Sequence, residues 1–257
     1  FDDARLALAL ARTAALKGAL LLNYCPVTGL IHEGGQLAGL HARDQESGRI
    51  FEIRARCIVN AAGVWVDQLR QLDAQAAGST ATPMVAPSQG VHLVVGREFL
   101  PGDHALLVPK TADGRVLFAV PWLGQVILGT TDTPRDDLAR EPLAFEAEID
   151  FILQESSRYL QRAPARSDVK SIWVGLRPLV KPPQGDGDHT KALSREHTVV
   201  VSRSGLVTVT GGKWTTYRAM AEDVLQKCVD HARLQARGLE VVWKVPHSND
   251  RVAGELD

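Results

Sequence analysis

The chain has 257 residues, 45% of them hydrophobic, and its 29 lysines and arginines nearly balance its 30 aspartates and glutamates. A chain of this length and apolar content can bury a sizeable core, as one large domain or two small ones, which argues against intrinsic disorder. The net charge of −1 argues against a general nucleic-acid-binding protein, but it leaves room for a local cationic pocket.

The three cysteines, Cys25, Cys57 and Cys228, lie far apart in the sequence and show no spacing typical of a zinc site, so we expect no bound metal. A sparse, odd number of cysteines is typical of a reducing compartment. No apolar run approaches the length of a membrane-spanning helix.

The chain opens with a predicted helix, which Asp2 or Asp3 can cap and which Gly18 can end after Lys17. Leucines and alanines occupy nearly every face of this helix, and such a helix is normally buried on most sides. We therefore expect the sequence to be a fragment of a longer protein. Left exposed, the helix would favour homodimer formation or poor solubility.

Strands and a second helix are predicted up to about residue 76. Residues 19–35 are typical of a strand that runs into a turn, and residues 36–63 of a hairpin with its turn at 45–48. Residues 64–72 begin a helix. The inward positions expected on the second arm of the hairpin are Phe51, Ile53, Ala55 and Cys57.

A small, polar and proline-bearing stretch at 76–90 indicates a crossing between domains. Apolar runs with short turns between them then predict an antiparallel sheet, followed by an amphipathic helix at 145–162 and a strand at 169–180. The strand candidates of the sheet are 91–96, 104–110, 115–122 and 125–132.

The last third begins with a polar loop at 181–191. A hairpin at 197–212 follows and leads into a helix that begins near Trp214. The weakly patterned tail, 233–257, is expected to be a loop. The fold class is therefore mixed, α+β or α/β.

Two joints share one design, a strand that passes through small residues into a helix. The first contains Ala61, Ala62 and Gly63, and the second contains Gly211, Gly212 and Lys213. Small residues let a ligand approach the backbone, and the helix that follows points its free N–H groups at that ligand. Either joint alone is equally well explained as a tight turn. Both together, with Lys213, favour an anionic or electron-rich ligand.

Two arginines and a histidine are candidate site residues. Arg177 lies inside an apolar strand, and Arg195 lies between a loop and a strand, where a guanidinium can bind phosphate or carboxylate with two bonds. Arg177 could equally face solvent or pair with an internal carboxylate. His92, which we expect at the start of a strand, can accept a proton near neutral pH, although a lone histidine is more often structural.

Six segments together resemble the FAD-dependent glycerol-3-phosphate dehydrogenases, in the order in which that family has them. The series "GTTDT", "GLRPL" and "GGKWTTYR" is specific, whereas any one of the three alone is not. The resemblance covers residues 2 to about 226 and corresponds to the middle of the family's sequence. The six segments are "DDARL", "IVNAAGVWVDQL", "VLFAVPWLGQVILGTTDT", "VGLRPLV", "LSREHTV" and "GGKWTTYRAMAEDVL".

The resemblance implies a partial FAD-binding domain of the glutathione-reductase or amino-acid-oxidase type, with an antiparallel substrate domain. Residues 1–80 and 194–232 would belong to the FAD domain, and residues 81–193 would bind substrate. The implied activity is oxidation of sn-glycerol 3-phosphate to dihydroxyacetone phosphate, with electrons passed through FAD to a quinone. The implied location is cytoplasmic, with peripheral attachment to the inner face of the cytoplasmic membrane left open.

The resemblance also implies roles for single residues. His92 would take the hydroxyl proton, while Arg177 and Arg195 would hold the phosphate. The residues implied to contact the flavin cofactor are Val27, Ala61, Ala62, Gly63, Gly211, Gly212, Lys213, Trp214 and Thr215.

The sequence departs from the family pattern at three places. The G-x-G-x-x-G segment that holds the FAD pyrophosphate and the helical C-terminal domain are both missing. Gln89 stands where we expect a lysine before His92. We therefore expect the purified chain to carry no tightly bound FAD.

Two other functions stay open. A flavin oxidase of an amino acid or a 2-hydroxy acid would need one arginine for a carboxylate rather than a cluster for a phosphate dianion. A non-catalytic chain without FAD is favoured by the missing pyrophosphate loop.

Overall fold

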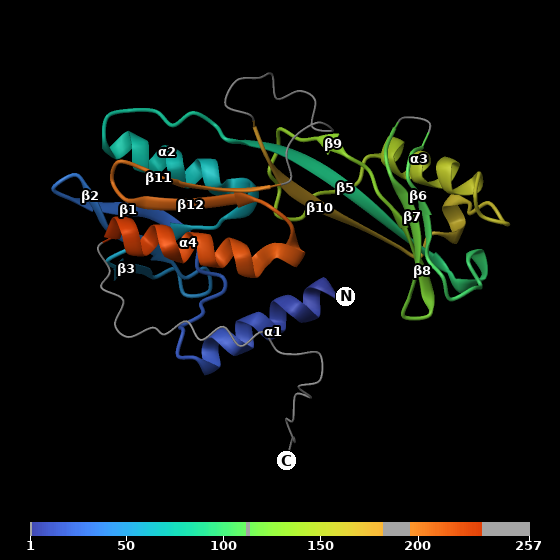
Figure 1. Ribbon diagram of the computed structural model, residues 1–257, viewed down its shortest axis with the longest axis horizontal. Coiled ribbons are helices and arrows are strands. Elements are labelled where there is room, and N and C mark those ends of the chain that lie inside the picture. The colour runs from blue at the N-terminus through green and yellow to red at the C-terminus, as the bar shows by residue number, and fades with distance from the viewer. Residues whose placement is uncertain (1, 112–113, 182–195, 233–257) are drawn as a thin grey trace, which may run out of the picture.

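The computed structural model describes residues 2–111, 114–181 and 196–232, and these residues form three β-sheets with helices on their faces. Two small sheets with α2 and α4 make up one half of the molecule, and a larger sheet with α3 makes up the other (Figure 1). The long strands β5, Val85–Gly96, and β10, Ser171–Val180, run from the first half into the second.

The predicted N-terminal helix is present as α1, Asp3–Leu16, and Asp2 caps it by accepting the N–H of Arg5 at 3.0 Å. None of its residues is buried, so the expected burial of this helix is not seen in the described part of the chain. In Figure 1 the helix lies apart from the sheets. Its exposed leucines include Leu8 and Leu16.

An antiparallel meander follows, in the order β1-β2-β3. The turn predicted at 45–48 is confirmed, because the N–H of Gly48 bonds to the carbonyl of Asp44 between the second and third strands. The strand predicted from residue 19 begins only at Val27, since Tyr24 has a φ of 50° and Pro26 follows it. The strands are β1, Val27–Glu33, β2, Gln36–Arg43, and β3, Ile50–Arg54.

The expected inward alternation on the third strand is wrong. Ile53 is 38% exposed and Ala55 is also exposed, because the meander is a thin three-stranded sheet with little to cover that face. Phe51 and Cys57 are half-buried.

The second small sheet joins segments from both ends of the chain. Its order is β11-β12-β4, in which β12, Leu206–Gly211, pairs antiparallel with β11, His197–Val201, and parallel with β4, Ile58–Asn60. Helix α4, Tyr217–Ala232, packs its Val224 and Cys228 on this sheet. The hairpin predicted at 197–212 is therefore confirmed. Its second strand pairs with β4, from the first third of the chain.

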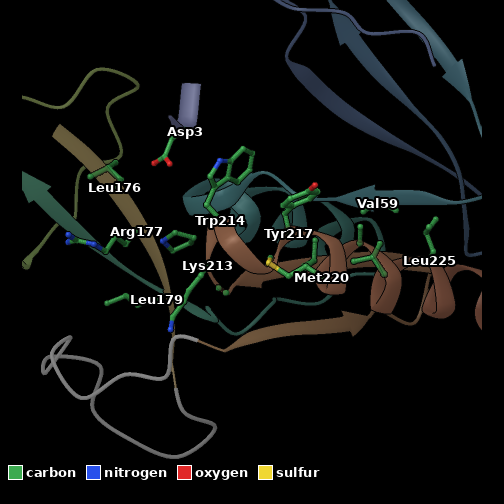
Figure 2. A pocket seen from close by; sticks show the side chains of 17 residues that line it. Asp3, Val59, Leu176, Arg177, Leu179, Lys213, Trp214, Tyr217, Met220 and Leu225 are labelled. Atoms are coloured by element: carbon green, nitrogen blue, oxygen red, sulfur yellow. The ribbon is translucent and has the colours of Figure 1, made fainter. Parts of the chain in front are cut away.

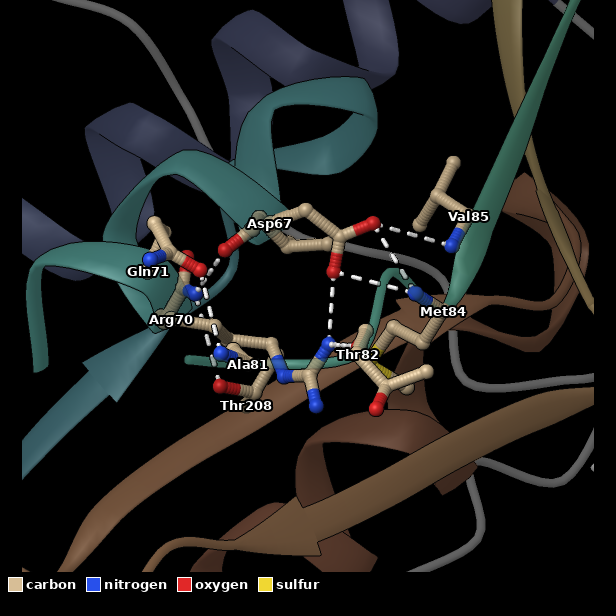
Figure 3. A network of polar contacts seen from close by, with 10 residues as sticks. Asp67, Arg70, Gln71, Ala81, Thr82, Met84, Val85 and Thr208 are labelled. Atoms are coloured by element: carbon tan, nitrogen blue, oxygen red, sulfur yellow. Dashed lines mark hydrogen bonds and ion pairs between the residues drawn. The ribbon is translucent and has the colours of Figure 1, made fainter. Parts of the chain in front are cut away.

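A polar network ties α2, Val66–Ala76, to the start of β5 (Figure 3). The Asp67 carboxylate accepts the backbone N–H groups of Met84 and Val85 at 3.0–3.1 Å, and Arg70 donates to Asp67 at 2.6 Å and to the Thr82 carbonyl at 2.7 Å. These bonds give the crossing between the two halves a defined geometry.

The larger sheet has the order β10-β5-β8-β7-β6, with β9 paired to β5. Its core lies between the strands and α3, Glu146–Ser157, and includes the fully buried Leu93, Leu128 and Ile152. Burying one such side chain stabilises the fold by about 1.5–3 kcal/mol. The remaining strands are β6, Leu106–Val108, β7, Leu117–Trp122, β8, Gln125–Gly129, and β9, Thr133–Pro134.

Strand β5 begins six residues before the expected strand, so part of the predicted crossing is regular sheet. Pro87 lies in it directly opposite Pro178 of β10, at the end of the sheet that reaches toward the other half. His92 therefore lies inside a 12-residue strand and not at a strand start.

Candidate active site

The first strand-to-helix joint leads from β4 through a short 3-10 turn, Gly63–Trp65, into α2. Gly63 has a φ of 60°, in the left-handed region that favours glycine. A Cβ at Gly63 would have no heavy atom of the described residues within 4 Å, apart from its chain neighbours. The side-chain amide of Asn60 holds the joint in place by donating to the Val66 carbonyl at 2.9 Å. The first joint therefore has open space beside its backbone.

The second joint leads from β12 through a 3-10 turn, Trp214–Thr216, into α4. Gly211 and Gly212 have φ values of 76° and 77°. A Cβ on Gly211 would lie 2.6 Å from the Glu196 carbonyl oxygen, and a Cβ on Gly212 would lie 2.6 Å from Met220 Sδ. The expectation that these glycines leave room for a ligand in place of their side chains is therefore wrong, because protein atoms fill both directions.

Lys213 lies between the second joint and its helix. Its backbone N–H donates to Thr216 Oγ1 at 3.3 Å, and the Thr216 hydroxyl donates to the Lys213 carbonyl at 3.0 Å, which caps the turn. Lys213 is exposed, and in Figure 2 its side chain points away from Trp214 and Tyr217.

Both joints and β10 border one cavity of about 940 Å³ (Figure 2). Most of its lining is apolar, with the small residues Ala61, Gly211 and Gly212 where strands end. Arg177 and Lys213 supply positive charge, and Asp3 of α1 supplies a carboxylate. The other lining residues are Val59, Leu176, Pro178, Leu179, Val209, Trp214, Tyr217, Met220, Ala221, Val224 and Leu225.

Arg177 and His92 lie on the same face of the larger sheet. In the register of β10 with β5, Arg177 is opposite Ser88, and Trp173 is opposite His92. Arg177 is the only charged residue on β5, β7, β8 and β10, apart from His92 if that imidazole is protonated. The structure thus brings two of the predicted catalytic residues to one surface.

The Arg177 guanidinium is held over β5. It donates to the Thr131 carbonyl at 3.0 Å and to Thr130 Oγ1 at 3.1 Å. A Cβ on Gly90 would overlap the guanidinium, so the glycine lets the guanidinium lie in this position. Arg177 also lines a second cavity of about 410 Å³, with Phe118, Thr130 and Asp132 on its wall. It therefore lies between the two cavities.

The His92 imidazole is half-buried and lies over the backbone of β8. Burial, and secondarily the charge of Arg177, lower the pKa of His92 to about 4. Its Nδ1 is buried and has no hydrogen-bond partner among the described residues. The imidazole is therefore neutral at pH 7 and can accept a proton.

Gln89, which stands where a lysine was expected, faces away from this surface. It is fully buried and donates to Glu148 of α3 at 2.6 Å and to the Leu143 carbonyl at 3.1 Å, while Arg135 donates to its oxygen. Glu148 also accepts bonds from Thr131 and Thr133. Gln89 thus has a structural role in a network on the far side of the sheet from Arg177.

The other predicted site residues divide into three groups. Trp214 lines the large cavity, with Ala61, Gly211, Gly212 and Lys213. Ala62, Gly63 and Thr215 lie in the joints but outside its lining, and Val27 lies in the meander, where it pairs with Ala42. Arg195, the loop at 181–191 except Lys181, and the tail at 233–257 lie outside the described residues.

Sequence reasoning missed Trp173 and Phe118, which flank His92. Trp173 precedes Arg177 by four residues on one strand, and this even spacing puts both side chains on one face. That spacing was a usable signal for Trp173. Phe118 comes from another strand, and only the sheet order could place it.

No helix among the described residues has the length and apolarity to cross a membrane. No group of three or more His, Cys, Asp or Glu side chains among them is placed to hold a metal ion.

Comparison with known proteins identifies several relatives. The family described as "DAO: FAD dependent oxidoreductase" matches residues 1–218. The mitochondrial glycerol-3-phosphate dehydrogenase of Saccharomyces cerevisiae is 39% identical over 258 residues, covering 90% of this chain and 40% of the yeast protein. The mitochondrial enzyme of the same name from Mus musculus is 42% identical over 243 residues, covering 91% of this chain and 32% of the mouse protein.

A solved structure is also similar to the chain. Glycerol-3-phosphate dehydrogenase from Bacillus halodurans, complexed with FAD, superposes with a TM-score of 0.76 at 33% identity. The match covers 91% of this chain and 44% of the Bacillus chain. The chain therefore spans less than half the length of each of these relatives.

Proposed function

Because the chain belongs to the FAD dependent oxidoreductase family, we propose that it forms the substrate face and part of the cofactor site of a glycerol-3-phosphate dehydrogenase. The reaction is oxidation of sn-glycerol 3-phosphate to dihydroxyacetone phosphate. The observation that carries this proposal is the placement of Arg177 beside a neutral His92, at the border of a cavity built from both joints. The names of the yeast, mouse and Bacillus relatives support the choice of substrate.

The large cavity fits the proposed cofactor. Its apolar walls suit a flat ring, and the small residues Ala61, Gly211 and Gly212 bring backbone to its surface. The free N–H groups at the start of α4 and the Lys213 ammonium favour an electron-rich group. These residues would hold FAD, which would supply the hydride acceptor of the reaction. Residues 1–80 and 194–232 form this domain, as the pairing of β12 with β4 supports.

Arg177 binds the substrate phosphate. Its guanidinium is already oriented by Thr130 and Thr131, so little side-chain freedom is lost when an anion binds. Residues 81–193 form the substrate domain around it. The sequence resemblance implies that Arg195, which lies outside the described residues, also binds the phosphate.

His92 takes the proton of the substrate hydroxyl. Its imidazole is neutral at pH 7, as a proton acceptor must be. A phosphate bound at Arg177 brings negative charge to this face, offsets the charge of Arg177 and raises the pKa of His92. The bound substrate thus makes His92 a stronger base than it is in the free protein.

The remaining parts of the proposal concern partners and location. Electrons would pass from the cofactor to a quinone, and the protein would be cytoplasmic, with peripheral attachment to the inner face of the cytoplasmic membrane left open. The family resemblance supports both. Exposed leucines on α1 support association into a homodimer, which light scattering measures directly.

The test is anaerobic bleaching of the flavin absorbance in a holoenzyme that contains this chain. The proposal expects bleaching by sn-glycerol 3-phosphate and none by glycine or 2-hydroxyglutarate. Bleaching by either of the latter two, with none by glycerol 3-phosphate, would establish the rival flavin oxidase instead. A protein that binds no FAD under any loading condition would support the non-catalytic alternative.

A further inference from the structure

The His92 ring is enclosed by aromatic side chains from two other strands. The Trp173 indole of β10 stacks on it with ring centroids 4.0 Å apart and an interplanar angle of 13°. Phe118 of β7 lies on another side, with centroids 5.5 Å apart and a tilt of 35°. The β10–β5 register places Trp173 directly opposite His92, so the stack follows from the sheet itself.

The backbone of β8 forms the floor beneath this ring. Gly129 pairs with both His92 and Phe118. A Cβ on Gly129 would lie 2.5 Å from His92 Cδ2 and 3.1 Å from His92 Nε2. The imidazole therefore lies against β8, and its position depends on packing from the indole above.

The orientation of the His92 ring depends on packing more than that of most catalytic histidines does. Catalytic histidines are commonly oriented by a hydrogen bond to the second ring nitrogen. His92 Nδ1 is buried and makes no such bond to any residue in the described part of the chain. Aromatic contacts are thus the visible means of orienting this ring.

We propose that Trp173 is a positioning residue, which holds the His92 imidazole over Gly129 in the orientation for proton transfer. The inference rests on the proposed function, since it assigns the proton acceptor of that reaction to His92. Trp173 acts through His92 and is not itself a catalytic residue.

Trp173 is partly exposed, so its contact with His92 can be removed without disturbing the hydrophobic core. Its side chain belongs to an edge strand and is 46% exposed, so much of the indole is not buried in the fold. Truncating it uncovers His92 without opening the core between the sheet and α3. Phe118, by contrast, lies on an interior strand of the sheet.

The same contact explains the electrostatics of His92. Burial is the larger cause of its lowered pKa, and the stacked indole supplies part of that burial. The charged group that acts on the pKa of His92 is Arg177 on β10, and Arg115 and Asp132 line the neighbouring cavity with Phe118. Removing the indole while these three charged side chains stay therefore isolates the packing contribution.

The first experiment is an NMR titration of histidine-labelled full-length chain, with His92→Gln to assign the resonance. The inference expects the pKa of His92 to rise from about 4 by roughly one unit or more in Trp173→Ala. Trp173→Phe, which keeps a stacking ring, should retain a pKa near the wild-type value. Trp122→Ala, which removes a partly buried indole from the far end of β7, should also leave it unchanged. An unchanged pKa in Trp173→Ala would overturn the inference.

The second experiment uses the FAD-loaded holoenzyme and its pH profile. In Trp173→Ala, kcat should fall at least about tenfold with KM nearly unchanged, because the proton acceptor is displaced while the phosphate contact stays. The acid limb of kcat/KM should move to higher pH, and Trp173→Phe should restore most of the rate. A wild-type rate in Trp173→Ala would overturn the positioning role.

The two experiments distinguish this inference from the proposed function. If the holoenzyme does not oxidise glycerol 3-phosphate at all, the proposed function fails. The titration still decides whether Trp173 holds His92, because it needs neither substrate nor turnover.

Discussion

The two strand-to-helix joints have the same sequence design but different surroundings. Both end a strand of one sheet, both use glycine at positive φ, and both pass through a 3-10 turn into a helix. At Gly63 a side chain would meet open space, whereas at Gly211 and Gly212 it would meet protein.

This difference indicates that the glycines of the two joints have different roles. Glycines of the second joint are required by the fold, because β11 and Met220 of α4 pack against them. The glycine of the first joint has no packing reason within the described structure beyond its backbone conformation. Open space next to a backbone is what a bound ligand needs, so we infer that the cofactor extends beyond the lining of the large cavity, which the first joint enters at Ala61, as far as Gly63.

The largest expected effect is on stability, in a matched pair of alanine substitutions. Gly211→Ala should destabilise the fold by about 2–5 kcal/mol, because left-handed strain and overpacking against the Glu196 carbonyl add. Gly63→Ala should cost only the strain, about 1–2 kcal/mol. Urea unfolding of both variants measures the difference. Equal losses of unfolding free energy in the two variants would show that the joints do not differ in packing.

Gly212→Ala should have an intermediate effect, about 1–3 kcal/mol. Its Cβ would meet Met220 Sδ, and a methionine can move where a backbone carbonyl cannot. Shortening the Met220 side chain by Met220→Ala should therefore recover part of the stability that Gly212→Ala loses. A double-mutant cycle with a coupling energy below about 0.5 kcal/mol would show that Met220 is not the obstacle.

A smaller effect is expected on cofactor binding at the first joint. Gly63→Ala should weaken FAD binding to the holoenzyme about tenfold, or about 1.4 kcal/mol, because its methyl group occupies the open space. Gly78→Ala is the matched control, since Gly78 has a φ of 65° and equally open surroundings at the end of α2. FAD titration followed by flavin fluorescence gives both affinities. Normal affinity in Gly63→Ala would mean that the cofactor does not use this space.

The smallest effect is expected from the charge at the second joint. Lys213→Met should lower the reduction potential of bound flavin by roughly 6–20 mV, since an exposed charge near a helix start contributes about 0.3–1 kcal/mol and 30 mV corresponds to about 1.4 kcal/mol. Lys227→Met makes the same charge change further along α4 and should leave the potential unchanged. Equal shifts in the two variants would deny Lys213 a local role.

Much of the fold followed from the sequence because the signals were local. Alternating apolar residues predicted β7, β8 and β10, and two apolar runs on either side of the polar turn at 202–205 predicted the hairpin of β11 and β12. The first half of β5 was missed, because prolines normally argue against a strand, and here Pro87 and Pro178 face each other across the ladder.

The candidate residues could be proposed from the sequence, but their arrangement in space could not. His92 and Arg177 were each identified, yet their shared face depends on a register between segments about 80 residues apart. The obstacles around Gly211 and Gly212 come from Glu196, Val180 and Met220, which no local pattern connects to them. Burial of α1 was expected from its composition alone, and composition does not say what a helix packs against.

The central claim, that Arg177 receives a phosphate, is tested most directly by comparing glycerol 3-phosphate with glycerol in the FAD-loaded holoenzyme. Arg177→Ala should lower kcat/KM for glycerol 3-phosphate at least about tenfold more than for glycerol, because a charge-assisted hydrogen bond contributes about 1.5–3 kcal/mol. Arg56→Ala removes an exposed arginine that lies outside the larger sheet of Arg177. It should leave kcat/KM unchanged for both substrates. Equal losses for both substrates in Arg177→Ala would contradict the account and leave Arg177 a structural residue.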